Sequence, residues 1–297
     1  MKLAIVRKGT TRVTVFSNAN ELYSLAESLG ISQEELDSNF YLYLERLISG
    51  QIHLDTIGDP VDDYTFDIPV PSVTSIRDFY AFEGHVMNAR KRRGFQVPDE
   101  WYRMPVFYYS NTSNLFASGA SVPRPSYTKE LDFEGEFAFL VGKDGINIKE
   151  ERAWDHVYGV TLANDWSARD VQLREYSVGL GPAKAKDFAT SLGPFLVTRD
   201  EIASRIIGEK VDLDLEVIRN QRIFGSGNFK DIYWNLGQMI QWASTDSWLR
   251  KGDIIMSGTV PGCCIFEAGP DKEGWVSPGE RITIRSSMIG SLDNKVS

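Results

Sequence analysis

The sequence predicts an α+β protein, mostly β with some α, and three observations support this fold class. Two short runs of β-type residues, 3–7 and 12–16, open the chain. Residues 131–143 alternate acidic and apolar side chains, and residues 211–220 alternate again in the C-terminal part. Helical spacing is confined to a few segments, such as 231–243.

Residues 1–70 are predicted to form a small N-terminal α/β domain. One of its helices has a clear start signal, because Ser32 and Glu35 match the S-x-x-E capping pattern. Apolar residues then recur at helical spacing until Gly50, namely Leu36, Phe40, Leu44 and Leu47. The segment 58–72 carries three prolines and is typical of an extended linker, so 71–297 is predicted to be the larger domain.

Composition and charge exclude several classes of protein. With 42% hydrophobic and 25% charged residues, the chain is neither disordered nor a membrane protein. A net charge of -9 argues against nucleic-acid binding, which depends on clustered Lys and Arg, but leaves open a small anionic substrate. Cys263 and Cys264 are adjacent and form no disulfide framework. We expect a soluble, cytoplasmic protein, since neither a signal peptide nor an 18-residue apolar run is recognisable.

The alternating stretch 131–143 places three acids at every second position. Asp132, Glu134 and Glu136 would therefore share one face of a strand. Three neighbouring carboxylates repel one another unless something neutralises them, and a divalent cation with oxygen ligands is one solution. The alternative is a strand whose polar face simply points to solvent.

His85 is the best candidate for a general base, because it follows Asp78 and Glu83 and begins a helix-like stretch. The alternative is a surface helix with a solvated basic face, since Arg and Lys are dense in 90–93. Tyr108 lies in an aromatic run that either lines a pocket or packs in the core.

Further downstream, Asp165 ends the apolar run 157–163, where a carboxylate must either pair or bind a metal. Arg169 and Asp170 offer a plain pairing explanation. Lys186 lies between glycine turns and is a point-charge partner for a substrate carboxylate or an enolate. Thr259 follows in a Gly-rich segment that could cradle an anion.

Six motifs occur in a characteristic order: DFYAFEGH (78–85), DFEGEFAFLVGK (132–143), NDWSARDVQ (164–172), the lysine loop GPAKAKDF (181–188), KGDIIMSGTVPGCCIFE (251–267) and the terminal PGERITIRSSMIGSLDNKV. From about Ser75 to its end the chain thereby resembles the fumarylacetoacetate hydrolase family. The resemblance implies a catalytic domain built as a β-sandwich roll, a divalent cation held by acids, and a homodimer. It also implies a reaction that cuts or rearranges the carbon skeleton of an oxo acid.

The resemblance assigns roles to individual positions. The metal ligands would be Asp78, Glu134, Glu136 and Asp165. The catalytic residues would be His85, Glu267 and Lys186, with Glu83 as a rival to Glu267 for orienting the histidine and Lys184 as a rival to Lys186. The substrate would contact Tyr108, Arg169, Gln172 and Thr259. No substrate arginine is assigned within 90–93.

The predicted activity is metal-dependent hydrolysis of a carbon–carbon bond in a 1,3-dioxo acid, of the acylpyruvate, fumarylpyruvate or fumarylacetoacetate type. Water activated by histidine would attack, and an enolate would leave. The alternatives are a decarboxylase of 2-oxo acids, a sugar-acid dehydratase, an isomerase, or a binding protein without activity. Mg²⁺ is the expected cation, with Mn²⁺ and Ca²⁺ as alternatives.

Overall fold

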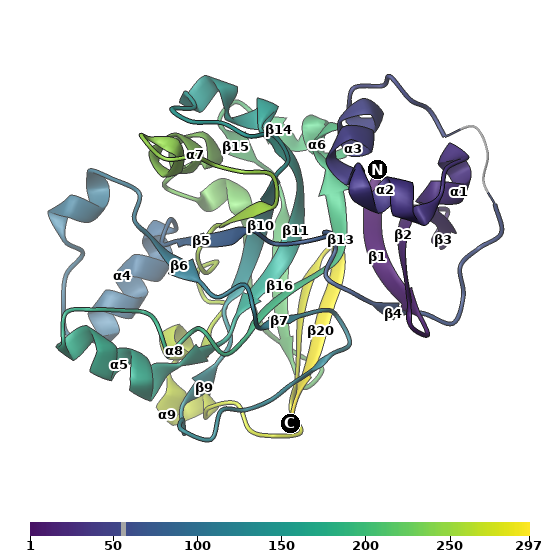
Figure 1. Ribbon diagram of the computed structural model, residues 1–297. Coiled ribbons are helices and arrows are strands. Elements are labelled where there is room, and N and C mark those ends of the chain that lie inside the picture. The colour runs from purple at the N-terminus through teal and green to yellow at the C-terminus, as the bar shows by residue number, and fades with distance from the viewer. Residues whose placement is uncertain (55–57) are drawn as a thin grey trace.

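The computed structural model describes residues 1–54 and 58–297, and its centre is an eleven-stranded sheet (Figure 1). Nine strands follow one another in the order β3 (Glu21–Ser24), β2 (Thr11–Asn18), β1 (Lys2–Lys8), β13 (Thr190–Thr198), β11 (Val157–Asp165), β10 (Gly135–Val141), β18 (Asp253–Met256), β5 (Ser75–Phe79) and β6 (Phe107–Ser110). Two short strands pair beside this path, β4 (Thr65–Phe66) with β1 and β7 (Leu115–Phe116) with β13.

A second sheet packs against the centre of the first. Its strands are β17 (Arg222–Asn228), β16 (Asp214–Arg219), β19 (Arg281–Ser286), β20 (Gly290–Val296) and β8 (Ser121–Val122), in that order. Two small ribbons complete the β structure, β12 (Ser167–Ala168) with β9 (Leu131–Asp132) and β14 (Ile206–Ile207) with β15 (Lys210–Val211). The mixed fold with more strand than helix is therefore confirmed.

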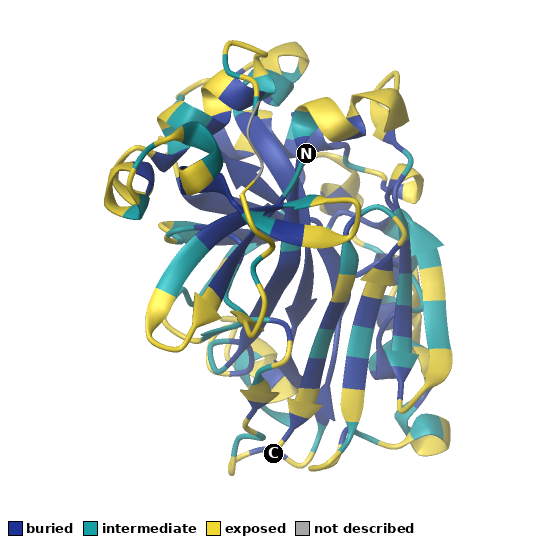
Figure 2. Cartoon of the chain, turned by 90° about the vertical axis from the view of Figure 1, so that its right-hand side faces the viewer, coloured by how far each residue is buried: buried dark blue, intermediate teal, exposed yellow. Residues whose placement is uncertain are grey.

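Strand β10 is buried on both of its faces, which explains why its sequence is apolar throughout after Glu136. Phe137 and Phe139 point into the core shared with the second sheet. Ala138 and Leu140 point the other way, into a core covered by the N-terminal helices. Figure 2 shows the strands in the middle of the molecule buried along their length, whereas strands toward one edge alternate between buried and exposed residues.

The N-terminal helices α1 (Leu25–Leu29), α2 (Gln33–Ser38) and α3 (Phe40–Ile48) cover one end of the large sheet (Figure 1). Ser32 caps α2 as predicted, because its hydroxyl accepts the Glu35 N–H at 3.1 Å. The predicted single helix is divided at Asn39, which ends α2 and begins α3. The predicted apolar face is correct, since Leu36, Phe40, Leu44 and Leu47 are all buried.

The remaining helices lie in the larger part of the chain. They are α4 (Glu83–Arg92), α5 (Arg169–Ser177), α6 (Arg199–Ile202), α7 (Leu236–Ser244), α8 (Ile265–Ala268) and α9 (Pro270–Glu273). Helix α7 begins later than the predicted position 231, because Asn235 forms a capping box with Gln238. Within residues 1–54 and 58–297, every helix is too short or too polar to span a bilayer.

The N-terminal segment 1–70 is joined to the rest of the chain through the sheet. Strand β1 pairs with β13, with Leu3 opposite Leu196. One apolar core contains residues from both parts, among them Leu3, Leu44, Leu140 and Leu196. The division at residue 70 stays a prediction, and a truncation would test it.

We expect the isolated segment 71–297 to be insoluble or to unfold without a cooperative transition. Removal of residues 1–70 uncovers the edge of β13 and five large apolar side chains: Leu140, Leu192, Leu196, Ile254 and Met256. Their exposure costs about 8–15 kcal/mol at 1.5–3 kcal/mol each, which matches the whole stability of a typical domain. Circular dichroism and thermal unfolding of 71–297 would check this. A soluble segment with a sharp transition would contradict it and support two independent domains.

Candidate active site

Three buried carboxylates from three strands of the large sheet form the floor of the site. Asp78 lies on β5, Glu136 on β10 and Asp165 at the end of β11, and one oxygen from each lies within 4.8 Å of the others. Burial, followed by the neighbouring acid Asp165, raises the pKa of Asp78 well above its usual range. Burial and Asp78 act in the same way on the pKa of Glu136. Assembled acids of this kind are unfavourable without a cation.

The donor set fits a hard divalent cation. Tyr108 donates its hydroxyl to Asp165 Oδ2 at 2.6 Å and to Asp78 Oδ2 at 3.1 Å, which holds two of the acids in place. The second oxygen of Asp165, Oδ1, is buried, and none of the described residues donates a hydrogen bond to it. Oxygen donors from carboxylates are the ligands that Mg²⁺, Mn²⁺ and Ca²⁺ prefer.

Glu134 lies beside this cluster but is engaged by two cations. Lys186 Nζ is 2.5 Å from its Oε2, and Arg169 Nη2 is 2.6 Å from its Oε1. Burial alone would raise the pKa of Glu134, but Arg169 and Lys186 outweigh burial and lower it. Lys186 also contacts Asp165. The four predicted ligands therefore lie together, with Lys186 between Glu134 and Asp165, and their role as ligands stays a prediction.

Lys186 rather than Lys184 reaches the site. The Lys186 side chain is buried among the acids, and although burial lowers its pKa, the charges of Asp165 and Glu134 raise it overall. Lys184 is exposed and pairs with Asp187 at 3.0 Å. The Lys186 amine is accordingly a fixed positive charge at the floor of the site.

Asp132 does not join the carboxylate floor, so the predicted ladder of three acids is wrong at its first member. Strand β9 ends at Asp132, and β10 begins only at Gly135. Asp132 instead accepts the backbone N–H groups of Ile265 at 2.8 Å and Phe266 at 3.0 Å and pairs with Arg169 at 2.8 Å. Its role in the structure is to anchor the start of α8.

The plain pairing of Asp165 with Arg169 or Asp170 is also wrong. Arg169 binds Asp132 and Glu134, and its Nη1 donates to Gln172 Oε1 at 3.1 Å. Asp170 accepts the Thr128 hydroxyl at 2.5 Å. The partners of Asp165 are Lys186 and Tyr108, which are distant from it in sequence.

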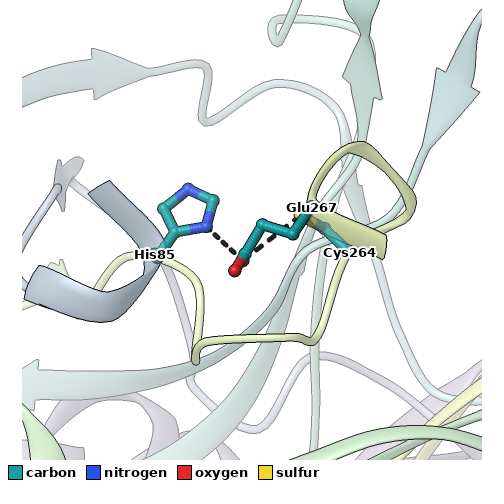
Figure 3. A group of neighbouring side chains, drawn as sticks. All are labelled: His85, Cys264 and Glu267. Carbon is teal, nitrogen blue, oxygen red and sulfur yellow. Dashed lines mark hydrogen bonds and ion pairs between the residues drawn. The ribbon is translucent and has the colours of Figure 1, made fainter. Parts of the chain in front are cut away.

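His85 and Glu267 form a dyad at the edge of the floor (Figure 3). His85 Nδ1 is 2.5 Å from Glu267 Oε1, so Nδ1 carries the proton and Nε2 is left as the basic nitrogen. Nε2 lies 4.0 Å from Glu134 Oε1. The rival Glu83 is turned away and accepts the Tyr102 hydroxyl at 2.8 Å. The geometry therefore selects Glu267 as the partner of His85.

Glu267 is held by several donors. Asn88 Nδ2 donates to its Oε2 at 2.8 Å, the Gly262 N–H donates to the same oxygen at 3.1 Å, and the Cys264 thiol lies 3.5 Å from Oε1. Burial would raise the pKa of Glu267, but His85 and these donors lower it, so the carboxylate stays ionised beside the imidazole. Sequence reasoning missed Cys264, although its position three residues before Glu267 was a usable signal.

A cavity of about 470 Å³ opens above the floor. Ten predicted site residues line it: Asp78, His85, Tyr108, Glu134, Glu136, Asp165, Arg169, Gln172, Lys186 and Thr259. Glu267 lies behind His85. Thr259 donates to Glu136 Oε1 at 3.4 Å, and the Gly258 N–H donates to Oε2 at 3.0 Å, so this segment holds an acid of the floor. The predicted anion cradle at Thr259 thus has a carboxylate of the protein as its partner.

Two arginines of the basic run 90–93 line the cavity, Arg90 on α4 and Arg93 just after its end. The Arg93 guanidinium stacks on the rings of Tyr176 at 5.0 Å and Phe266 at 4.9 Å.

Residues 74–297 match the model of the fumarylacetoacetate (FAA) hydrolase C-terminal domain. The chain belongs to the fumarylacetoacetate hydrolase family. Enzymes of this family use divalent metal ions, which agrees with the acidic cluster of Asp78, Glu136 and Asp165.

Curated relatives in the family carry different activities. The chain is 32% identical over 200 residues to the oxaloacetate tautomerase fahd2, mitochondrial, of Xenopus laevis, which covers 67% of this chain and 59% of the relative. It is 31% identical over 246 residues to the fumarylacetoacetase of Caenorhabditis elegans, with coverage of 67% and 58%. The chain thus spans less than two thirds of the length of these relatives.

Solved structures share the fold along the whole chain. A fumarylacetoacetate hydrolase from Exiguobacterium antarcticum superposes with a TM-score of 0.75 at 21% identity, covering 100% of this chain and 99% of the other. A maleylpyruvate hydrolase from Sphingobium superposes with a TM-score of 0.71 at 21% identity, covering 100% and 99%. Both confirm the predicted family fold, and the family as a whole is enzymatic with hydrolases, isomerases and tautomerases among its members.

Two buried aspartates, Asp78 and Asp132, should respond differently to metal. In Asp78→Asn, we expect thermal stability in EDTA to be at least that of the original protein, because a buried carboxylate of raised pKa is replaced by a neutral isostere. The stabilisation by Mg²⁺, about 2.7 kcal/mol at a hundredfold excess over Kd, should be lost.

The matched variant is Asp132→Asn. It should be destabilised with and without Mg²⁺, by up to about 3–5 kcal/mol, because Arg169 loses a buried partner while the floor keeps its acids. Mg²⁺ should still raise its unfolding temperature. Thermal unfolding of both variants, with and without Mg²⁺, is the measurement. If Mg²⁺ raises the unfolding temperature of Asp78→Asn as much as that of the original protein, the assignment of Asp78 as a cation ligand is wrong.

Proposed function

We propose that this protein is a divalent-cation-dependent hydrolase that cleaves a carbon–carbon bond in a 1,3-dioxo acid. The observation that carries the proposal is the His85–Glu267 dyad, whose basic nitrogen lies beside the acid floor in the same cavity. A dyad of this kind suits activation of water. Only hydrolysis, among the reactions considered, requires water as a nucleophile.

His85 and Glu267 have different roles in the proposed reaction. His85 Nε2 takes a proton from water, and Glu267 stabilises the imidazolium that results. The hydroxyl attacks the outer carbonyl carbon of the substrate, and the bond from this carbon to the central CH₂ then breaks. The electron pair passes to the inner oxo acid, which leaves as an enolate and is protonated on carbon. The products are a carboxylic acid and a 2-oxo acid.

Lys186 contributes charge at the same place. Its ammonium group is buried between Glu134 and Asp165, so it is positioned to stabilise negative charge that develops above the floor. A divalent cation held by Asp78, Glu136 and Asp165, with Glu134 as a further candidate ligand, would polarise the substrate carbonyl. The substrate is proposed to be a small anionic oxo acid, Mg²⁺ to be the first cation to test, and the protein to act as a cytoplasmic homodimer.

Proton transfer without water attack is the second candidate. It is favoured by the oxaloacetate tautomerases among the relatives, and it needs only a base, a fixed positive charge and an enolisable 2-oxo acid. Decarboxylation of a 2-oxo acid, dehydration of a sugar acid and isomerisation would use the same floor.

A substrate panel separates these reactions. Metal-stripped protein would be mixed with acetylpyruvate, fumarylpyruvate, fumarylacetoacetate and oxaloacetate, with and without Mg²⁺ or Mn²⁺. We expect metal-dependent cleavage of at least one dioxo acid. Chromatography of the two acid products would detect it. If oxaloacetate alone reacts, by enolisation or by loss of CO₂, the hydrolase proposal is wrong.

Variants of the dyad test how the base is held. His85→Ala should lower kcat by about 100-fold or more, the scale of a lost general base, while the Mg²⁺-induced stabilisation persists. Glu267→Gln should also lower kcat, because the amide cannot stabilise an imidazolium.

Glu83→Gln is the matched control, since Glu83 contacts Tyr102 and not His85. Its kcat should stay near that of the original protein. If Glu83→Gln greatly lowers kcat while Glu267→Gln has normal turnover, Glu83 rather than Glu267 is the partner of His85.

A further inference from the structure

The wall of the cavity changes character from floor to mouth. On α5, the residues that face the cavity are Arg169 and Gln172 near the floor, then Leu173 and Tyr176 one turn later. Spacings of three, four and seven residues place all four on one side of the helix. Arg169 and Gln172 are buried, whereas Leu173 is 62% and Tyr176 40% exposed. The face of α5 thus becomes apolar as it leaves the charged floor.

The opposite wall also has a large apolar side chain at the mouth. His85, Ala89 and Arg90 on α4 line the cavity, and Phe95, just beyond the helix, lines the mouth with 61% of its surface exposed. Pro182 completes the mouth between the end of α5 and Lys186. We call Phe95, Leu173, Tyr176 and Pro182 the apolar rim. Large apolar side chains so exposed around one opening are typical of a binding surface.

The cavity is large enough for a whole small-molecule ligand. Its volume of about 470 Å³ lies within the roughly 300–1,000 Å³ of ligand sites in proteins. The polar head of the substrate needs the floor, where the acids, Lys186 and His85 lie. The rest of the cavity extends outward between α4 and α5, which lie side by side in Figure 1.

Two arginines line the cavity, Arg90 and Arg93, and Arg90 is half-buried on α4. Arg93 is engaged by the protein, because it stacks against Tyr176 and Phe266 and lies 3.4 Å from Gln172 Oε1. These contacts fix the ring of Tyr176 as a wall of the opening. An apolar chain that leaves the floor would therefore pass along Tyr176 toward Leu173 and Phe95.

We propose that the substrate carries an extended apolar acyl chain, alkyl or aryl, whose outer part is bound by the apolar rim. The inference rests on the proposed function for the reaction at the floor, and it adds the substrate class: a 1,3-dioxo acid of the long-chain or aromatic acylpyruvate type. The rim supplies binding by removing the chain from water, and it sets specificity without contacting the bond that breaks.

Binding without turnover tests the rim independently of the chemistry. Unbranched 2-oxo acids from pyruvate to 2-oxooctanoate carry the polar head group but have no 1,3-dioxo bond to cleave. We expect Kd, measured by calorimetry with Mg²⁺ present, to fall by up to about fourfold for each methylene that the rim buries. A Kd that does not change with chain length would overturn the proposal. A Kd that falls only when the chain ends in a second carboxylate, as in 2-oxoadipate, would also overturn it.

Kinetics then connect the rim to the reaction. Hexanoylpyruvate and benzoylpyruvate should each show a higher kcat/KM than acetylpyruvate, because each adds apolar surface that the rim can bury. If none is cleaved while the 2-oxo acids still bind more tightly with length, the hydrolase proposal fails and the rim stands. If acetylpyruvate is cleaved and added chain length increases neither the affinity nor kcat/KM, the proposal about the rim is wrong and the hydrolase proposal is supported.

A pair of leucine variants locates the effect. Leu173→Ser should flatten the dependence of Kd on chain length, because it removes the largest aliphatic contact of the rim. Leu180→Ser is the control: Leu180 is 73% exposed on the loop after α5 and does not line the cavity. Its chain-length dependence should match that of the original protein. If the dependence of Kd on chain length flattens equally in both variants, or changes in neither, the placement of the chain along Leu173 is wrong.

Discussion

The compensation of buried negative charge governs the centre of this protein. Five carboxylates, Asp78, Asp132, Glu134, Glu136 and Asp165, are nearly removed from solvent, and each would be costly alone. Arg169 and Lys186 offset part of this charge by direct contact, and Arg169 joins Asp132 to Glu134. The three acids of the floor remain under-compensated, which is why a cation fits there and why their protonation depends so strongly on burial.

Through Asp132, the same charge network positions the dyad. Asp132 receives the first N–H groups of α8, and Glu267 lies on that helix. The carboxylate that orients His85 is thus fixed by an anchor that also touches Arg169, and Arg169 touches the acid beside Nε2 of His85. The floor and the dyad form one electrostatic unit. Arg93 stacks on Tyr176 of the rim and lies 3.4 Å from Gln172 Oε1, and Gln172 accepts from Arg169 of that unit.

The sequence predicted much of this site, and its failures have physical causes. Alternation placed Glu136 on a strand, but it could not show that the chain leaves the strand between Asp132 and Gly135, where Glu134 lies. Local spacing suggested Arg169 as a partner of Asp165, whereas the true partners come from other strands and loops. The choice between Glu83 and Glu267 depends on a contact across 182 positions, which no local pattern encodes. Leu173 and Phe95 were missed because single exposed apolar residues are common on any surface.

The pairing of β1 with β13 has a consequence for how the chain is made. Lys2 lies opposite Val197, so at about 5–20 residues per second a ribosome needs roughly 10–40 s to supply the partner of the first strand. During that interval one edge of β1 has only the short β4 to cover it, at Val6 and Arg7. The hairpin with β2 can form at once, because Lys8 already lies opposite Thr11 at its turn. The nascent chain therefore carries an open strand edge until residues 190–198 are synthesised and pair with it.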